Sequence, residues 1–279
     1  MKKISRRSFL AAAGLSVAAL ALTACGGSSA STASSVAGSA ASSEAASTSA
    51  AAGELATVEA GKLTMATNAA FPPYEMTTDA GEFEGIDIET AQAIADKLGL
   101  ELQIDDMDFD AALLSVQQGK ADIVMAGVTV TDERKAVMDF SDSYATGIQS
   151  IIVPEGSDIA SPDDLAGKKI GTQRGTTGYI YCSDDFGDEN VVAYDDGLTA
   201  VQALNNGQVD AVVIDNAPAK EFVAANPGLV ILDTSYAEED YAIGMAKGSS
   251  LEDAVNAALK ELKADGTLQS IVDKYITAE

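Results

Sequence analysis

Asp110-Ala-Ala-Leu-Leu-Ser-Val-Gln-Gln-Gly-Lys-Ala-Asp-Ile-Val-Met125 decides the fold, because its pattern returns as Leu198-Thr-Ala-Val-Gln-Ala-Leu-Asn-Asn-Gly-Gln-Val-Asp-Ala-Val-Val213. Each copy predicts a helix that ends at a glycine, followed by an aspartate and an apolar strand. A helix, a glycine and a strand in this order are common in α/β proteins. The Gly-x-x-Asp that both copies share nevertheless favours two related lobes.

Short apolar runs alternate with helical periodicity before the first copy. Residues 62–67 predict a strand, and residues 89–98 predict a helix that ends at Gly99. Apolar residues then alternate over 100–104, which indicates the next strand. The sequence therefore predicts an α/β fold built from βαβ units with mainly parallel sheets.

Ligand groups in an open α/β sheet belong just beyond the carboxyl ends of its strands. In the two copies these ends are Gly127 and Asp215. We expect the two edges to face each other and to form a ligand cleft.

The composition of the chain excludes several classes of function. The chain has 279 residues, no histidine and a net charge of −26. Such a surface repels nucleic acid. Without histidine, the chain can build neither a Ser/His/Asp nor a Cys/His triad, and it lacks the commonest metal ligand. We therefore expect no nucleic-acid partner, no metal and no cofactor.

The first 24 residues have the order of a secretory signal peptide. Basic residues at 2–7 precede an apolar run at 9–22, and Leu-Thr-Ala-Cys25 follows directly. This end resembles the lipobox of bacterial lipoproteins, which implies a lipidated Cys25; the alternative is a cysteine buried in a transmembrane helix. Arg6-Arg7 also resembles a twin-arginine signal, so the export route stays open between the Sec and twin-arginine pathways.

Residues 25–53 then form the predicted tether. After Cys25 they consist almost wholly of Ser, Ala, Thr and Gly, which offer too little apolar surface to offset ordering entropy. A chain of this kind reaches roughly 30 Å. Cleavage before Cys25 removes four positive charges, so the mature chain carries −30.

Four phrases in a fixed order resemble the polar amino acid binding proteins of bacterial importers, the family-3 extracellular solute-binding proteins. They are ATNAAFPPYE with GEFEGIDIE, AGVTVTDER followed by DFSDSY, GKKIGTQRGTTG, and VDAVVIDNAPA. The resemblance covers about residues 61–275. It implies a two-lobed periplasmic-binding-protein-like (type II) fold, with a hinge of two crossing segments. Lobe 1 is expected at 54–149 plus 241–279, and lobe 2 at 150–240.

The resemblance also implies a site that binds the two charged ends of an amino acid zwitterion. The family's carboxylate-binding arginine falls on Arg134, and its ammonium-binding acid falls on Asp215. Without the resemblance, Arg134 would be interpreted as a solvated charge at the start of a helix. Asp215 can equally be interpreted as an N-cap.

Backbone groups around the carboxylate are implied at two further places. Ala126, Gly127 and Thr129 supply backbone groups and a hydroxyl at a strand end. Thr176 and Thr177 lie in a loop whose amides can point at an anion, although an ordinary turn and helix cap would have the same sequence.

The side chain of the substrate is implied to lie between Phe71 and Phe109, although core packing is the commoner role of Phe. Asn68 and Gln173 match positions that contact its far end. An acid often occupies the position of Asn68 in relatives selective for cationic substrates, so a neutral polar amino acid is narrowly favoured. Glu75 lies close in the sequence and keeps a cationic substrate possible.

The expected function is that of a receptor lipoprotein of an ABC-type amino acid importer, held outside the bacterial cell membrane by its lipid anchor alone. We expect a monomer that delivers its ligand to membrane permease subunits and is not an enzyme. Two alternatives remain: a dehydratase-like enzyme on the same fold, in which Glu75 would have to be the acid, and a structural surface lipoprotein.

Overall fold

The computed structural model describes residues 55–276. The predicted signal peptide, Cys25 and the predicted tether lie outside the described residues. Within the described part, every helix is too short or too polar to cross a membrane.

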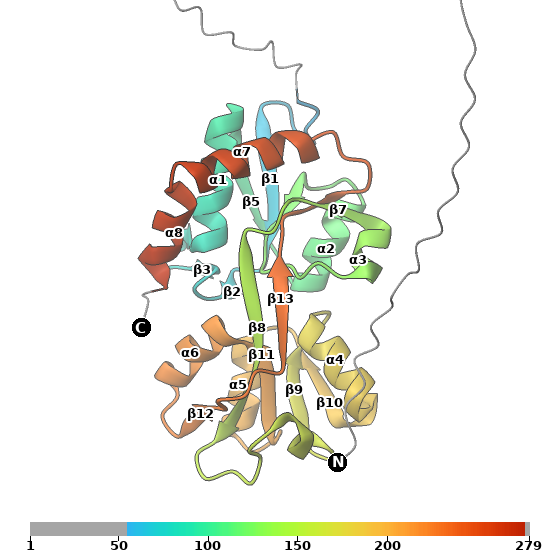
Figure 1. The fold of residues 1–279 in the computed structure, drawn as a ribbon, viewed down its shortest axis with the longest axis vertical. Coiled ribbons are helices and arrows are strands. Elements are labelled where there is room, and N and C mark those ends of the chain that lie inside the picture. The colour runs from blue at the N-terminus through green and yellow to red at the C-terminus, as the bar shows by residue number, and fades with distance from the viewer. Residues whose placement is uncertain (1–54, 277–279) are drawn as a thin grey trace, which may run out of the picture. The chain divides into compact units, whose positions relative to one another are not determined.

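One sheet has five strands, ordered β5-β1-β6-β14-β7 (Figure 1). Their bounds are Lys62–Thr67 (β1), Glu101–Asp106 (β5), Ile123–Val124 (β6), Met138–Phe140 (β7) and Gly244–Ala246 (β14). Strand β1 is parallel to β5 and β6, whereas β14 is antiparallel to both of its neighbours. The sheet is therefore mixed and not mainly parallel, because a late segment of the chain returns to it.

The helices that belong with this sheet are α1 (Ile86–Leu98), α2 (Phe109–Gln117), α3 (Asp132–Val137), α7 (Glu252–Ala264) and α8 (Thr267–Tyr275). A small sheet of three strands, β2 (Ala70–Phe71), β3 (Glu75–Thr77) and β4 (Phe83–Glu84), precedes α1. We call these elements together the first half.

The second sheet is ordered β10-β9-β11-β8-β12, and β13 pairs with β8. Its strands are β8 (Ala145–Pro154), β9 (Ile170–Gln173), β10 (Val191–Tyr194), β11 (Ala211–Asp215), β12 (Leu229–Ile231) and β13 (Ala237–Tyr241). Its helices are α4 (Thr177–Phe186), α5 (Gly197–Asn205) and α6 (Asn216–Ala225), with short 3₁₀ turns at Pro162–Leu165 and Asp188–Asn190. We call this sheet and its helices the second half.

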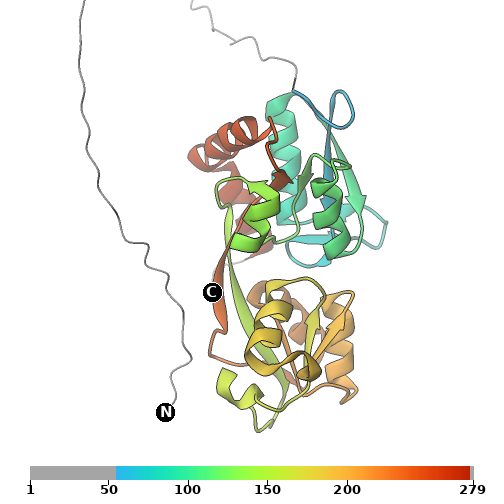
Figure 2. The ribbon, with the colours of Figure 1, turned by 90° about the vertical axis from the view of Figure 1, so that its right-hand side faces the viewer.

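Two neighbouring strands, β8 and β13, run between the halves (Figures 1 and 2). They are antiparallel, so that Ala145 lies opposite Tyr241 and Gln149 lies opposite Ala237. Gly147 makes room at this crossing: a Cβ there would lie 2.4 Å from the ring of Tyr241. The absence of a side chain at Gly147 therefore lets the Tyr241 ring pack closely against β8.

Alternating side chains pack on opposite faces of both sheets. In β1, Met65 belongs to the core under α1 and α7, while the next residue, Ala66, belongs to the core under α2. In β11, Val212 packs with α5 and α6, while Val213 packs on the α4 side. Strands buried on both faces explain why these runs read as continuously apolar.

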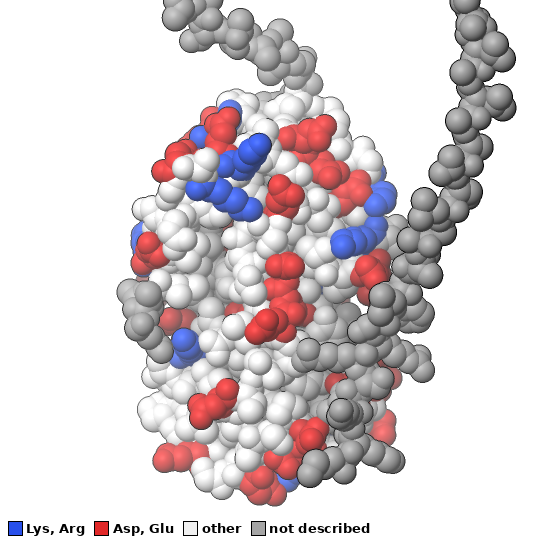
Figure 3. Space-filling model, viewed as in Figure 1, with Lys and Arg blue, Asp and Glu red and all other residues white. Residues whose placement is uncertain are grey.

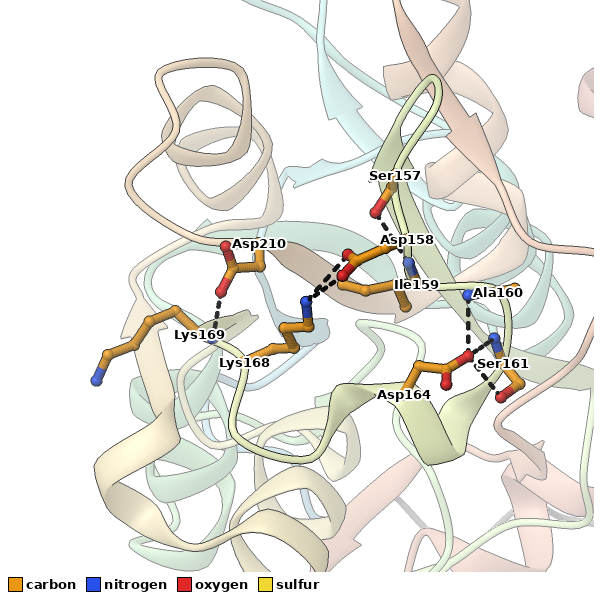
Figure 4. A network of polar contacts seen from close by, with 9 residues as sticks. All are labelled: Ser157, Asp158, Ile159, Ala160, Ser161, Asp164, Lys168, Lys169 and Asp210. Carbon is orange, nitrogen blue, oxygen red and sulfur yellow. Dashed lines mark hydrogen bonds and ion pairs between the residues drawn. The ribbon is translucent and has the colours of Figure 1, made fainter.

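The surface carries the expected excess of acid. On the face shown in Figure 3, acidic side chains are spread over both halves, while basic side chains gather mainly over the upper part of the view. One exception is a polar network in the loops of the second half, where the Lys168 ammonium bonds both oxygens of Asp158 at 3.0 and 2.9 Å (Figure 4). Nearby, Ser161 and Asp164 form a reciprocal capping box that begins a 3₁₀ turn.

Candidate functional site

A pocket with an empty volume of about 440 Å³ lies between residues of the first and the second half. All eleven predicted site residues line it: Asn68, Phe71, Phe109, Ala126, Gly127, Thr129, Arg134, Gln173, Thr176, Thr177 and Asp215. The structure thus brings together positions that are up to 147 residues apart in the chain.

Arg134 lies in the first turn of α3 and is only 8% exposed. Its guanidinium donates to the carbonyl of Thr129 at 2.8 Å and to the carbonyl of Gly175 at 3.1 Å, so acceptors from both halves fix it. Its Cζ also lies 5.4 Å from the centre of the Phe109 ring, a cation–π distance. Interpreted from sequence alone as a solvated charge, this side chain is instead buried and held in place.

Burial lowers the pKa of the Arg134 guanidinium, and the negative charge of Glu239 opposes this effect. An arginine stays protonated despite such a shift. The pocket therefore contains a fixed positive charge.

Thr177 is the first residue of α4, and Thr176 is its N-cap. The Thr176 hydroxyl accepts a hydrogen bond from the backbone N–H of Tyr179 at 3.3 Å, so the ordinary capping role is present. The first N–H groups of a helix have no acceptor within the helix, and the helix dipole adds positive charge there. This end of the pocket therefore suits an anion.

Asp215 supplies the opposite charge and is 2% exposed. It ends β11 and caps α6, since one carboxylate oxygen accepts from Ala217 N at 3.0 Å and the other accepts from Ile148 N at 2.7 Å. Its two interpretations from sequence are therefore compatible, because the cap also lines the pocket. Burial raises the pKa of Asp215 to about 6, against the hydrogen bonds from Ile148 and Ala217.

Aromatic rings form the apolar walls. Phe71 and Phe109 line the pocket and are 9% and 5% exposed, and the Phe71 ring stacks on Tyr74 with centroids 5.8 Å apart. Gly127 has φ 54°, and a Cβ there would lie 3.0 Å from Phe71 and 3.2 Å from Tyr241. Glycine at this strand end therefore meets both the backbone conformation and the close approach of the rings.

The two predicted amide side chains meet in the wall of the pocket. Gln173 donates to the side-chain oxygen of Asn68 at 2.8 Å, and Asn68 donates to the carbonyl of Met107 at 3.0 Å. Asn68 belongs to the first half and Gln173 ends β9, so this bond also joins the halves.

Glu75 is the least expected feature of the pocket. It lines the wall, is fully buried, and neither of its carboxyl oxygens accepts a hydrogen bond from an N–H or O–H group of residues 55–276. Burial raises its pKa well above the ordinary value, and the neighbouring Asp87 carboxyl adds to the effect.

Asp87 neighbours Glu75 and is itself fully buried. It accepts hydrogen bonds from Gly127 N at 3.0 Å and from the Tyr144 hydroxyl at 2.8 Å. Burial raises the pKa of Asp87 to about 6. The two carboxyl groups can share a hydrogen bond only while one of them carries a proton.

Five lining residues were not among the predicted site residues: Glu75, Gln149, Val213, Ile214 and Tyr241. Glu75 lies in the first of the four phrases, but the sequence does not show that its carboxyl group is buried without hydrogen-bond donors from residues 55–276. Tyr241 begins the segment that returns to the first sheet, and its place in the pocket depends on the β8–β13 crossing. Among residues 55–276, no group of three or more acidic or cysteine side chains could hold a metal ion.

Comparison with known proteins gives one consistent result. The bacterial extracellular solute-binding proteins of family 3 match residues 63–278. The L-cystine-binding protein TcyJ of Escherichia coli is 33% identical over 226 residues, which are 79% of this chain and 85% of that protein. The arginine-binding extracellular protein ArtP of Bacillus subtilis is 34% identical over 228 residues, with 78% and 87% covered.

A solved structure agrees with these relatives. The arginine-, lysine-, histidine-binding protein ArtJ of Geobacillus stearothermophilus has a TM-score of 0.75 and 34% identity, with 78% of this chain and 96% of that chain covered. This likeness confirms the predicted periplasmic-binding-protein-like fold class.

Proposed function

Since the chain belongs to the bacterial extracellular solute-binding proteins of family 3, we propose that it captures a free amino acid and presents it to the permease subunits of an ABC importer. Its family consists of solute-binding proteins and not enzymes, which removes the dehydratase-like alternative. Membership also places the protein outside the cytoplasm.

The observation that carries this proposal is the pair of opposite charges in one pocket. Arg134 and the N-terminus of α4 suit a carboxylate, and Asp215 suits an ammonium. Both charged side chains are buried and fixed by backbone partners, so little order has to be gained on binding. The carboxylate and the ammonium of a zwitterion are the two groups that pair with these opposite charges.

Closure of the two lobes is part of the proposal, with lobe 1 at 54–149 plus 241–279 and lobe 2 at 150–240. Strands β8 and β13 would be the hinge. Arg134 and Phe71 come from the first half, and Thr177 and Asp215 from the second. Only a closed cleft brings all four to one ligand, so occupancy favours closure through differential contacts.

For the side chain of the ligand we propose a cationic group, although Asn68 alone favoured a neutral one. Glu75, Asp215 and the nearby Glu239 make the pocket acidic, and Arg134 is the one basic residue among those that line it. A buried carboxyl without a donor is costly unless a ligand supplies one. The names of ArtP and ArtJ support this choice, while that of TcyJ shows that similar chains bind other amino acids.

Titration calorimetry with arginine, lysine, histidine, glutamine and cystine tests the function and the substrate class together. We expect the tightest binding for arginine or lysine, and we expect Glu75→Gln to reduce it while leaving glutamine binding nearly unchanged. Tighter binding of glutamine than of every cationic amino acid would refute the cationic assignment. Absence of binding by all five would refute the receptor proposal.

Proton release gives a second readout of the cationic group. Burial beside Asp87 raises the pKa of Glu75 in the free protein, and a bound cation would lower it again. Binding should then release a proton, and affinity should rise with pH up to the raised pKa. Calorimetry in buffers of different ionisation enthalpy measures this release, which Glu75→Gln should remove.

Anchoring through a lipidated Cys25 and a monomeric state also remain proposals. Cys25→Ser should release the protein from the membrane fraction without changing ligand affinity. Retention in the membrane like wild type would show that Cys25 is not the anchor.

A further inference from the structure

Glu239 lies on β13, one of the two strands that run between the halves, and is 7% exposed. One of its carboxylate oxygens accepts three hydrogen bonds: from the Thr177 hydroxyl at 2.9 Å, the Thr129 hydroxyl at 3.1 Å and the Gln149 side-chain amide at 2.9 Å. None of the sequence phrases singles out this residue.

The three donors come from different parts of the fold. Thr129 follows β6 in the first half, Thr177 begins α4 in the second half, and Gln149 lies on β8. The two threonine hydroxyl oxygens are 3.4 Å apart. A single buried carboxylate therefore links both halves and the crossing strands.

The link fixes the acceptor to which the two threonine hydroxyls donate. A hydroxyl has one proton, so a threonine that donates to Glu239 cannot donate that proton to a ligand. Thr129 and Thr177 would then offer an α-carboxylate their backbone N–H groups, with their side chains held away from it. The negative charge of Glu239 also counteracts the burial of Arg134, which lies at the same end of the pocket.

We propose that Glu239 is a positioning residue that orients Thr129 and Thr177 for the carboxylate of the ligand and holds the two halves together. This proposal rests on the proposed function for its ligand, whereas the joining of the halves does not depend on which ligand binds. Glu239 does not line the pocket and acts through the two threonines.

Matched substitutions on β13 test the proposal. Glu238 precedes Glu239 on the same strand and is exposed, so Glu238→Ala removes the same charge without touching the link. With L-arginine as the probe in calorimetry, Glu239→Ala should weaken binding at least tenfold, since hydrogen bonds to a charged group are lost. Glu238→Ala should stay within about twofold.

Glu239→Gln separates the acceptor from the charge. The amide oxygen can still accept from the threonines, so affinity should stay within about threefold of wild type. A loss as large as that of Glu239→Ala would overturn the proposal, because the charge and not the acceptor would then matter. Equal affinities of Glu239→Ala and Glu238→Ala would overturn it as well.

A double-mutant cycle with Thr177→Val excludes a merely structural effect. If Glu239 acts through the Thr177 hydroxyl, Thr177→Val should weaken binding in the wild-type background and change it little in Glu239→Ala. Losses that simply add would contradict the link.

Small-angle scattering of the ligand-free proteins distinguishes this proposal from the proposed function. Glu239→Ala should have a larger radius of gyration than wild type and Glu238→Ala, even if no amino acid binds. An unchanged radius would overturn the joining of the halves. Absence of binding by wild type, with a changed radius, would refute only the choice of ligand.

Discussion

The two copies of the helix–glycine–aspartate–strand pattern share the geometry of their turn but place opposite charges in the pocket. Gly119 and Gly207 both have φ 66° and end their helices in the same way, each donating to the carbonyl three residues earlier. Asp122 and Asp210 both exchange backbone and side-chain hydrogen bonds with the start of the neighbouring strand, at Thr64 and Lys169.

The copies differ in the charged residue beyond the strand and in the burial of the aspartate before it. Strand β6 leads through Gly127 to the cationic Arg134, whereas β11 ends directly at the anionic Asp215. Asp122 is 5% exposed and also binds Val58 N, whereas Asp210 is exposed. A repeated unit thus fixes where a strand ends, while the next few residues decide which charge stands there.

The largest loss of ligand affinity is expected for substitution of Arg134, the charged residue beyond the first copy. Arg134→Ala should weaken ligand binding thirtyfold or more, because truncating one partner of a buried charge pair costs about 2–5 kcal/mol. Arg134→Lys should fail as well, since an ammonium cannot reproduce the bidentate geometry of a guanidinium. Calorimetry measures both, and near-wild-type affinity in Arg134→Ala would place the carboxylate elsewhere.

Ligand affinity should also depend on Asp215, the charged residue at the end of the second copy, both when it is substituted and when the pH changes. Asp215→Asn should weaken binding about tenfold, because the amide can keep one capping bond but loses the charge that pairs with an ammonium. Since burial raises the pKa of Asp215 to about 6, the fall of wild-type affinity with decreasing pH should become steeper below about pH 6. Affinity profiles from pH 5 to 8 for both proteins check this, and an equally steep fall in Asp215→Asn would assign the titration to another group.

The two aspartates of the repeat should differ in their effect on stability. Each oxygen of Asp122 accepts a backbone N–H, so an asparagine must turn its amide nitrogen toward one donor. Asp210 uses one oxygen for Lys169 N, which an asparagine can replace.

Asp122→Asn should therefore cost about 2 kcal/mol and Asp210→Asn under about 1 kcal/mol in the free energy of unfolding. Denaturant titration monitored by circular dichroism gives both values. Equal losses would mean that the link from Asp122 to Val58 contributes nothing.

The smallest difference between the two copies is expected at their glycines. Gly119 and Gly207 share a left-handed backbone, and a Cβ at either position would meet no atom within 4 Å. Alanine at each position should thus lower the free energy of unfolding by about 1 kcal/mol through backbone strain alone. A difference much larger than about 0.5 kcal/mol would show that the two copies are not equivalent in energy.

The periodicity of apolar residues and the glycines that end helices were enough to predict many elements of the fold. The strand predicted at 62–67 is β1, and the helix predicted from 89 begins at Ile86 and ends before Gly99, as expected. These local signals work because backbone capping and side-chain alternation depend on near neighbours in the chain. The strand predicted after Asp122 is only two residues long, since just Ile123 and Val124 are paired with residues of β1 and β14.

The site could be assembled from sequence only with the help of the resemblance. It identified eleven residues that the fold gathers around one pocket, ten of them within its four phrases and Phe109 outside them. The spacing of Arg134 and Asp215 in the chain does not say that they face each other, and a lone arginine in TDER is as compatible with solvent.

By itself, then, the sequence determined the elements, the repeat, the opposite charges at the two strand ends and the excess of acid. Only the tertiary structure decided that Glu75 is buried without a donor among residues 55–276, that Tyr241 packs on Gly147, and that Glu239 links threonines from both halves. The physical reason is that these features depend on burial and on contacts across the β8–β13 crossing. The contacts of Tyr241 and Glu239 join chain segments more than sixty residues apart, which no local pattern records.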